Sequence, residues 1–152
     1  MAEIKVGDKL PIFESKDQNG NDFHIASVLH EKVLIIYFYP KDDTPGCTKQ
    51  ACFFRDQYEE FKDLGAEVIG ISGDSVKSHK KFADDYKLPF TLLSDGDKQL
   101  RKLFGVPTNL LGFLPGRVTY VVDKEGVVRL VFDSMNADNH FSKVVEAVKK
   151  LI

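Results

Sequence analysis

Seven consecutive apolar residues, Val33 to Tyr39, form the longest apolar run in this chain of 152 residues. A strand half in water would alternate with polar residues, so this run, rich in β-branched and aromatic types, predicts a strand buried on both faces. Pro40 ends it, because proline cannot donate a hydrogen bond to a neighbouring strand. Thr44 and Pro45 then suit the N-cap and first position of a helix, for which Gly65 is the expected end.

Both cysteines of the chain fall in this predicted helix, Cys47 in its first turn and Cys52 five residues later. Backbone N–H groups in the first turn lack helical partners and the helix dipole is positive there, which favours a thiolate over a thiol. Cys47 also begins a stripe with the spacing of a core-facing side, which continues through Ala51, Phe54, Tyr58 and Phe61. Cys52 lies among polar positions, where a cysteine that fills the core is not expected.

A disulfide between Cys47 and Cys52 is incompatible with an intact helix. Residues five apart in an α-helix have Cα atoms about 8–9 Å apart, whereas a disulfide needs less than about 7 Å. The first turns would therefore have to unwind. That is costly for a structural crosslink, but it suits a bond that forms and breaks once in each reaction cycle.

The remaining segments predict an α/β fold in a single domain, residues 1–152. Apolar positions around Phe13 and Phe23, with Asn19–Asn21 as the turn, predict an N-terminal β-hairpin. Later segments predict strands at 66–72, 90–93, 117–122 and 127–132, helices from Asp74 to about Tyr86, at 97–104 and from about Asp138, and an apolar loop rich in Gly and Pro at 105–116. Parallel strands crossed by helices and completed by an antiparallel pair give a central mixed β-sheet flanked by helices, the form of the thioredoxin fold.

The run PKDDTPGCTKQACFFRD resembles the active-site motif of the peroxiredoxins, which is Pro, three residues, Thr or Ser, two residues and Cys. Pro40, Thr44 and Cys47 meet this pattern. A second cysteine five residues later is similar to the Q-type, or bacterioferritin-comigratory, branch, and TPGCTKQAC is most like its chloroplast and cyanobacterial members. The resemblance continues through GAEVIGISGDS, KLPFTLLSD and LPGRVTYVVDKEGVV, so it covers nearly the whole chain and implies the thioredoxin fold.

The resemblance implies a thiol-specific peroxidase for hydrogen peroxide and organic hydroperoxides. Cys47 would attack one peroxide oxygen and become a sulfenic acid. Thr44 could place its hydroxyl near the sulfur or the peroxide, in addition to capping the helix, and Pro40 would shield the pocket from water. Backbone N–H groups of Gly46 and Cys47 would hold the peroxide oxygens as charge moves onto them. Cys52 would then attack the sulfenic acid and form an intramolecular disulfide, an atypical two-cysteine cycle.

The local motif lacks a fixed cation, and the family supplies one at the start of a late strand in a pattern like GRVTYVVD. Arg117 matches it and would hold the thiolate and polarise the peroxide; the competing interpretation is a solvated charge at a strand end. Arg55 is a second cation, but it shares the polar side of the helix with Cys52 and is expected at the surface. Gln50 occupies a position where many relatives have Glu, and a neutral amide can hydrogen-bond but cannot act as a base.

Thioredoxin or glutaredoxin is the expected reductant, and a monomer is the expected state. A formal charge of −2 provides no basic field, which argues against nucleic acid or an anionic membrane as a partner. The four histidines, at 24, 30, 79 and 140, show no ligand spacing with each other or with the cysteines, so neither a metal nor another cofactor is expected. His79 is expected to be a half-buried helix residue.

No apolar run approaches the roughly 18 residues of a transmembrane helix, and no apolar signal region opens the chain. We therefore expect a cytoplasmic protein, with a chloroplast or another organelle, after removal of a transit peptide, as the alternative.

Two other functions stay open on the sequence. A thioredoxin-type thiol–disulfide oxidoreductase uses Cys-x-x-Cys, whereas the third residue after Cys47 is Gln50. A non-enzymatic redox sensor, whose helix unwinds on oxidation, needs the cysteines but not Arg117. The apolar loop at 105–116 is a candidate for one wall of a substrate entrance.

Overall fold

The structure is a computed structural model that describes residues 3–106, 108–109 and 114–151. In chain order its elements are β1 (Glu14–Asp17), β2 (Asp22–His24), a 3-10 turn (Ile25–Ser27), β3 (Val33–Phe38), α1 (Pro45–Asp63), β4 (Ala66–Ser72), α2 (Val76–Tyr86), β5 (Thr91–Ser94), α3 (Gln99–Phe104), β6 (Thr108–Asn109), β7 (Leu114–Pro115), β8 (Val118–Val122), β9 (Val128–Asp133) and α4 (Ala137–Lys150). The strands and helices that the sequence predicts have bounds within about two residues of these.

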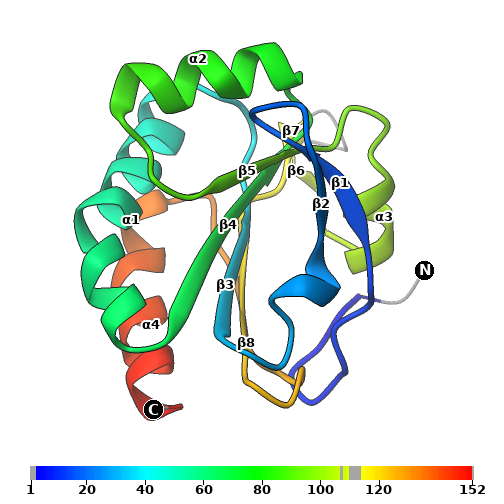
Figure 1. The fold of residues 1–152 in the computed structure, drawn as a ribbon, viewed down its shortest axis with the longest axis vertical. Coiled ribbons are helices and arrows are strands. Elements are labelled where there is room, and N and C mark those ends of the chain that lie inside the picture. Colours follow the sequence, from blue (N-terminus) through cyan, green and yellow to red (C-terminus); the bar gives the residue numbers. More distant parts are fainter. Residues whose placement is uncertain (1–2, 107, 110–113, 152) are drawn as a thin grey trace.

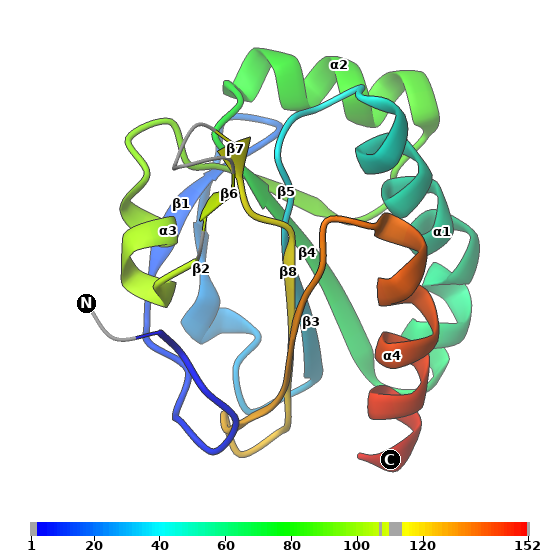
Figure 2. The same cartoon turned by 180° about the vertical axis from the view of Figure 1, so that it is seen from behind.

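Seven strands form one mixed sheet in the order β2-β1-β5-β4-β3-β8-β9. The central strands β5, β4 and β3 are parallel, and the outer strands pair with their neighbours antiparallel. Helices α1 and α4 lie side by side on one face and α3 lies on the other, as Figures 1 and 2 show from opposite sides. The predicted thioredoxin-like α/β fold, with its mixed sheet and N-terminal hairpin, is confirmed.

Strand β3 is buried along its whole length, as its sequence predicts. Successive side chains of a strand point to opposite faces of the sheet. Tyr37 and Tyr39 therefore pack in the core beneath α1 and α4, whereas Ile36 and Phe38 pack in the core beneath α3. The predicted stripe of α1, which begins with Cys47, is buried in the first of these cores.

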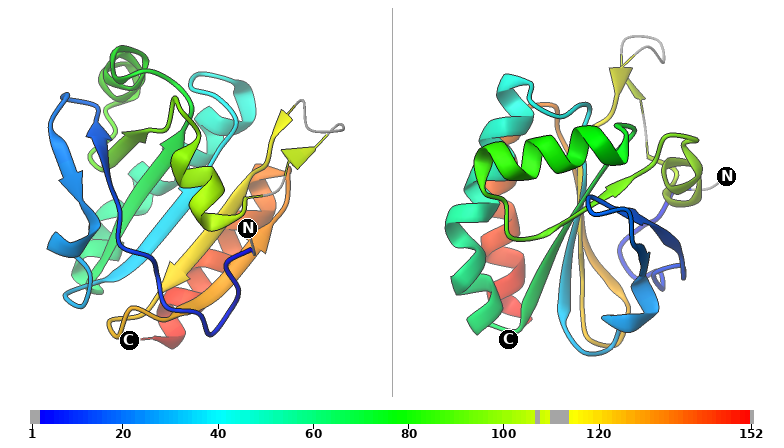
Figure 3. Two further views of the ribbon diagram at one scale, coloured as in Figure 1. Left: turned by 90° about the vertical axis from the view of Figure 1, so that its right-hand side faces the viewer. Right: turned by 45° about the horizontal axis from the view of Figure 1, so that its top comes forward.

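Strand β3 has neighbours of opposite direction on its two sides. On one side β4 runs parallel to β3, and on the other side β8 runs antiparallel. Because Phe38 pairs with Val118, the start of β8 lies beside the end of β3. Figure 3 shows the loop into α1 and the chain entering β8 at the same end of the sheet. Residues that adjoin these two strands are thus brought together.

The segment predicted as an apolar loop, 105–116, contains the short strands β6 and β7, which pair antiparallel apart from the main sheet. Strands of two residues are too short for a periodic sequence pattern to reveal them. Residues 107 and 110–113, part of the loop suggested as a wall of the substrate entrance, lie outside the described residues. Within the described ranges, none of the helices combines the length and the apolar character needed to cross a bilayer.

Candidate active site

Cys47 lies in the first turn of α1, as predicted, and its side chain is only 1% exposed. Pro45 occupies the first helical position, and Thr44 has the extended backbone of an N-cap residue. Cys52 is partly exposed on the other side of the helix, and both cysteines are free thiols. Because α1 is unbroken through both positions, this is the state in which the two sulfurs cannot be joined.

The guanidinium of Arg117 lies against the Cys47 sulfur. Its Nη2 donates to Sγ over 3.4 Å, and its Nε donates to the carbonyl oxygen of Met135 over 3.1 Å. The arginine directly precedes β8, so the pairing of Val118 with Phe38 brings it to the carboxyl end of β3. With 4% of its surface exposed, Arg117 is not the solvated strand-end charge of the competing interpretation.

The charge of Arg117 has no neutralising carboxylate among the residues that the structure describes. In the part of the chain that the structure describes, its guanidinium forms no ion pair with Asp or Glu. Its hydrogen-bond partners there are the Met135 carbonyl oxygen, the Gln50 amide oxygen and the Cys47 sulfur. A buried cation without a counter-charge interacts favourably with negative charge, so Arg117 can stabilise charge that develops on the sulfur or on an oxygen beside it.

Gln50 is fully buried and holds the other arm of the guanidinium. Its Oε1 accepts a hydrogen bond from Arg117 Nη1 over 2.6 Å. The amide orients the arginine and leaves its charge in place. A carboxylate at the same position would neutralise that charge. Sequence reasoning left the role of Gln50 in doubt, although its position three residues after Cys47 puts both side chains on one helix face.

Replacing Gly46 by alanine should slow the oxidation of Cys47 by peroxide about tenfold. A Cβ at position 46 would lie 3.0 Å from Arg117 Nη2, so the guanidinium would have to move from its place beside the sulfur. The rate is measured as loss of the Cys47 thiol after mixing with peroxide. In the matched control, Gly73→Ala, the new Cβ meets nothing nearer than the Asp95 carbonyl oxygen at 3.7 Å, so the rate should not change. Equal rates for the Gly46 variant and the wild type would show that this close approach does not matter.

Thr44 and Pro40 are both half-buried beside this site. The predicted side-chain cap by Thr44 is wrong, because its hydroxyl donates to the carbonyl oxygen of Lys41 over 2.9 Å and makes no capping bond. The N–H groups of Gly46 and Cys47 are therefore left uncapped by a side chain, and they stay available to an acceptor that enters the site.

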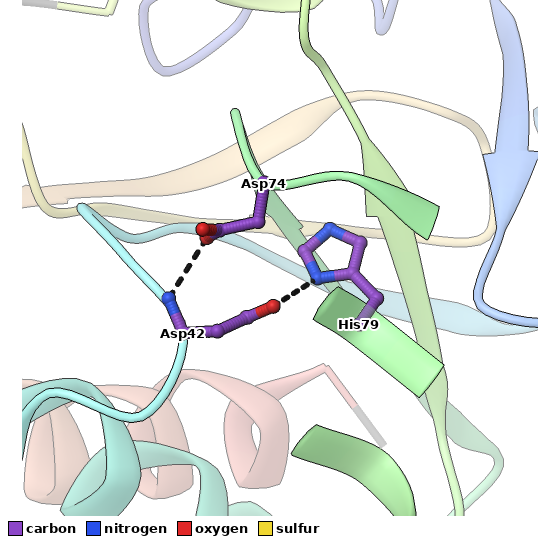
Figure 4. Close-up of side chains that lie close together, drawn as sticks. All are labelled: Asp42, Asp74 and His79. Carbon is purple, nitrogen blue, oxygen red and sulfur yellow. Dashed lines mark hydrogen bonds and ion pairs between the residues drawn. The ribbon is translucent and has the colours of Figure 1, made fainter. Parts of the chain in front are cut away.

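The loop between β3 and α1 is anchored by the buried side chain of Asp42. Its carboxylate accepts hydrogen bonds from three neighbours, Tyr39, Ser78 and His79. Its backbone N–H donates to Asp74 Oδ2 over 2.8 Å. Figure 4 shows Asp42 between Asp74 and His79, with both interactions drawn. These contacts tie the loop that leads into α1 to the end of β4 and to α2.

His79 is fully buried, so the expectation of a half-buried residue is wrong. Its Nδ1 lies 2.7 Å from Asp42 Oδ2, and its Nε2 lies 3.0 Å from the carbonyl oxygen of Leu93. The ring therefore joins the Asp42 carboxylate to the backbone of β5. Polar atoms of Asp42, Asp74 and His79 lie within 4.8 Å of one another. Each ring nitrogen of His79 already has a hydrogen-bond partner, so the cluster is arranged as a hydrogen-bond network.

A second buried arginine, Arg101 of α3, links the two halves of the site. Its Nη2 donates to the carbonyl oxygen of Tyr39 over 3.0 Å, and its Nη1 donates to that of Gly116 over 3.4 Å. Tyr39 directly precedes Pro40, and Gly116 directly precedes Arg117. One guanidinium therefore holds the end of β3 and the start of β8 in place. Burial lowers the pKa of Arg101. Sequence reasoning missed this residue, since no local signal marks a buried arginine in a six-residue helix.

Arg55, the competing cation, does not contact Cys47. Its guanidinium donates to Asp56 and to the carbonyl oxygen of Tyr86, each over 2.9 Å. About a third of its side chain is exposed, 34%, as expected for the polar side of α1. The cation that meets the sulfur is therefore Arg117, from a distant strand.

Comparison with known proteins identifies the family of this chain. The model of the AhpC/TSA family matches residues 6–131. The chain belongs to the AhpC/TSA family. It is 52% identical to the chloroplastic peroxiredoxin Q of Sedum lineare over 151 residues, which cover 99% of this chain and 81% of that protein. It is also 52% identical to the chloroplastic peroxiredoxin Q of Arabidopsis thaliana over 149 residues, or 97% of this chain and 68% of that protein.

Two solved structures have the same fold as this chain. Peroxidoxin BcpB of Mycobacterium tuberculosis superposes with a TM-score of 0.90 at 36% identity, over 99% of both chains. The bacterioferritin comigratory protein of Xanthomonas campestris, whose structure was described in relation to its alkyl peroxide reduction activity, gives 0.84 at 31% identity over 94% of this chain and 98% of that one. The predicted likeness to Q-type peroxiredoxins is confirmed, and the protein is a thiol-dependent peroxidase.

Proposed function

We propose that this protein reduces hydrogen peroxide and organic hydroperoxides, with Cys47 as the attacking group. The observation that carries the proposal is the buried guanidinium of Arg117, 3.4 Å from the Cys47 sulfur and without a carboxylate partner among the described residues. The thiolate attacks one peroxide oxygen and the O–O bond breaks. The sulfur is oxidised to a sulfenic acid, and the other oxygen leaves as hydroxide or alkoxide and takes a proton to become water or alcohol.

The remaining residues of the site stabilise the charge that moves onto oxygen. Arg117 and the N–H groups of Gly46 and Cys47 face this charge as hydrogen-bond donors. Thr44 supplies a hydroxyl at the helix start, and Pro40, which has no N–H, limits the access of water. Each of these roles is supported by the position of the residue around the end of β3.

Cys52 completes the cycle as the resolving cysteine. It attacks the sulfur of the Cys47 sulfenic acid, an S–S bond forms, and hydroxide leaves and is protonated to water. A dithiol protein of the thioredoxin or glutaredoxin type then reduces the disulfide. We infer that the protein works as a monomer. The chloroplast relatives favour the organelle alternative over the cytoplasm.

Intact mass after one equivalent of hydrogen peroxide tests the two-cysteine cycle. The wild type should lose about two hydrogens through a Cys47–Cys52 disulfide. Cys52→Ser should gain about one oxygen, located at Cys47. If both proteins stay fully reduced after prolonged exposure, Cys47 is not the attacking group and the proposal fails.

The two alternative functions explain less of the site. The third position after Cys47, where a thioredoxin-type oxidoreductase has its second thiol, is an amide bonded to Arg117. A redox sensor has no need of a buried cation beside its cysteine. Reduction of insulin disulfides without consumption of peroxide would favour the oxidoreductase.

A further inference from the structure

The segment that carries both cysteines needs two conformations. Cys47 meets Arg117 while the first turns of α1 are helical. Its bond to Cys52 requires those turns to unwind, because of the distance between the two positions on a helix. The contacts that hold these turns helical therefore influence what happens to an oxidised Cys47.

Tyr86, the last residue of α2, contacts the chain on both sides of this segment. Its hydroxyl donates to Asp43 Oδ1 over 2.7 Å, two residues before α1 begins. Its carbonyl oxygen accepts from Arg55 Nη1 over 2.9 Å, three residues after Cys52. We call these two hydrogen bonds the Tyr86 clamp. One residue of α2 thus joins both ends of the stretch that has to unwind.

Both ends of the hydroxyl bond are fixed in place. The Tyr86 ring packs edge-on against the buried Phe82, with 5.4 Å between ring centroids. Asp43 has a φ of +59°, a left-handed conformation that few residues other than glycine adopt, and Asp is one that tolerates it. The bond to Asp43 raises the pKa of Tyr86, so the phenol stays protonated and remains a donor.

We propose that the Tyr86 clamp holds the cysteine segment helical and so sets the ratio of disulfide formation to over-oxidation of Cys47. This inference rests on the proposed two-cysteine cycle. In the helical state, a second peroxide can oxidise the sulfenic acid to a sulfinic acid, and that peroxide is reduced to water or alcohol. In the unwound state, Cys52 attacks the same sulfenic acid, and the products are a disulfide and water. Tyr86 is a positioning residue, since it touches neither the peroxide nor the Cys47 sulfur.

Tyr86→Phe removes the hydroxyl and keeps the ring against α2. We expect disulfide formation to become about threefold to tenfold faster, the range that the loss of one hydrogen bond gives. The peroxide concentration that converts half of Cys47 to sulfinic acid during turnover with dithiothreitol should rise by a similar factor. The rate of the first oxidation should not change. Intact mass of quenched samples follows the sulfenic acid, the disulfide and the sulfinic acid.

Tyr58→Phe is the matched control. Tyr58 also lies on α1 and donates to a carboxylate, Glu67 Oε1, over 2.8 Å, but eleven residues after Cys47 and outside the segment that unwinds. This variant should form the disulfide and the sulfinic acid as the wild type does. Asp43→Gly should resemble Tyr86→Phe, because it removes the acceptor and glycine adopts the left-handed conformation of this position. The double variant should add little, because the two changes remove the same bond.

Hydrogen exchange of the reduced protein separates failure of this inference from failure of the two-cysteine cycle. Amides of residues 47–53 should exchange faster in Tyr86→Phe than in the wild type. In Tyr58→Phe they should exchange at the wild-type rate. Both results are expected whether or not a disulfide forms. Unchanged exchange in Tyr86→Phe would overturn the clamp. Faster exchange with an unchanged ratio of disulfide to sulfinic acid would overturn its link to over-oxidation. Absence of a Cys47–Cys52 disulfide in the wild type would instead overturn the proposed cycle.

Discussion

Replacing Arg117 by methionine should lower the rate of Cys47 oxidation by peroxide about 10²–10³-fold. The change removes the buried cation that lies 3.4 Å from the sulfur and keeps an unbranched side chain in its place. Both the thiolate and the charge that develops on the leaving oxygen lose their main partner. Stopped-flow mixing with hydrogen peroxide, followed by quenching and intact mass, measures the rate directly.

Arg129→Met is the matched control for this prediction. Arg129 lies on β9, its side chain is half exposed, and its guanidinium is paired with Asp123. Loss of this charge should leave the oxidation rate unchanged. If the Arg117 variant also reacts within twofold of the wild type, the site has no need of its cation, and the redox-sensor interpretation becomes the better one.

Replacing Asp42 by asparagine should destabilise the reduced protein by about 3–5 kcal/mol. The amide has the size of the carboxylate but no charge, so the buried His79 ring loses its carboxylate partner. For a chain of this length the midpoint of thermal unfolding should fall by roughly 10 °C. Urea unfolding of the reduced protein, monitored by circular dichroism, gives the free energy.

The exposed pair of Lys16 and Asp22 provides the comparison. Their charged atoms lie 2.6 Å apart, but both side chains are more than half exposed. Asp22→Asn should therefore leave the free energy of unfolding almost unchanged. A similarly small loss for Asp42→Asn would mean that the buried pair of Asp42 and His79 contributes little to stability.

The sequence alone determined the strand β3, the helix α1 and the side of α1 that faces the core. Seven apolar residues in a row require burial on both faces, and the spacing from Cys47 to Phe61 identifies the buried stripe. Gly65 ends the helix region with a φ of +80°, which glycine adopts without strain. These features depend on residues a few positions apart, so a linear pattern is enough to predict them.

The resemblance to peroxiredoxins singles out Cys47, Cys52 and Arg117 by their motifs alone. It does not determine how they meet. The contact between Arg117 and Cys47 joins residues seventy positions apart, and it depends on the register of β8 against β3. A shift by one residue would turn the side chain of each paired position to the other face of the sheet.

Tertiary structure alone decided the surroundings of the site. It made Gln50 a partner of Arg117 and buried His79 beside Asp42. It also set Arg101 between two strand ends and placed Tyr86 across the helix start. In most of these contacts the partners lie on elements dozens of residues apart in the chain. Their meeting depends on the order and register of the strands and on where each crossing helix ends, which a local sequence pattern does not encode.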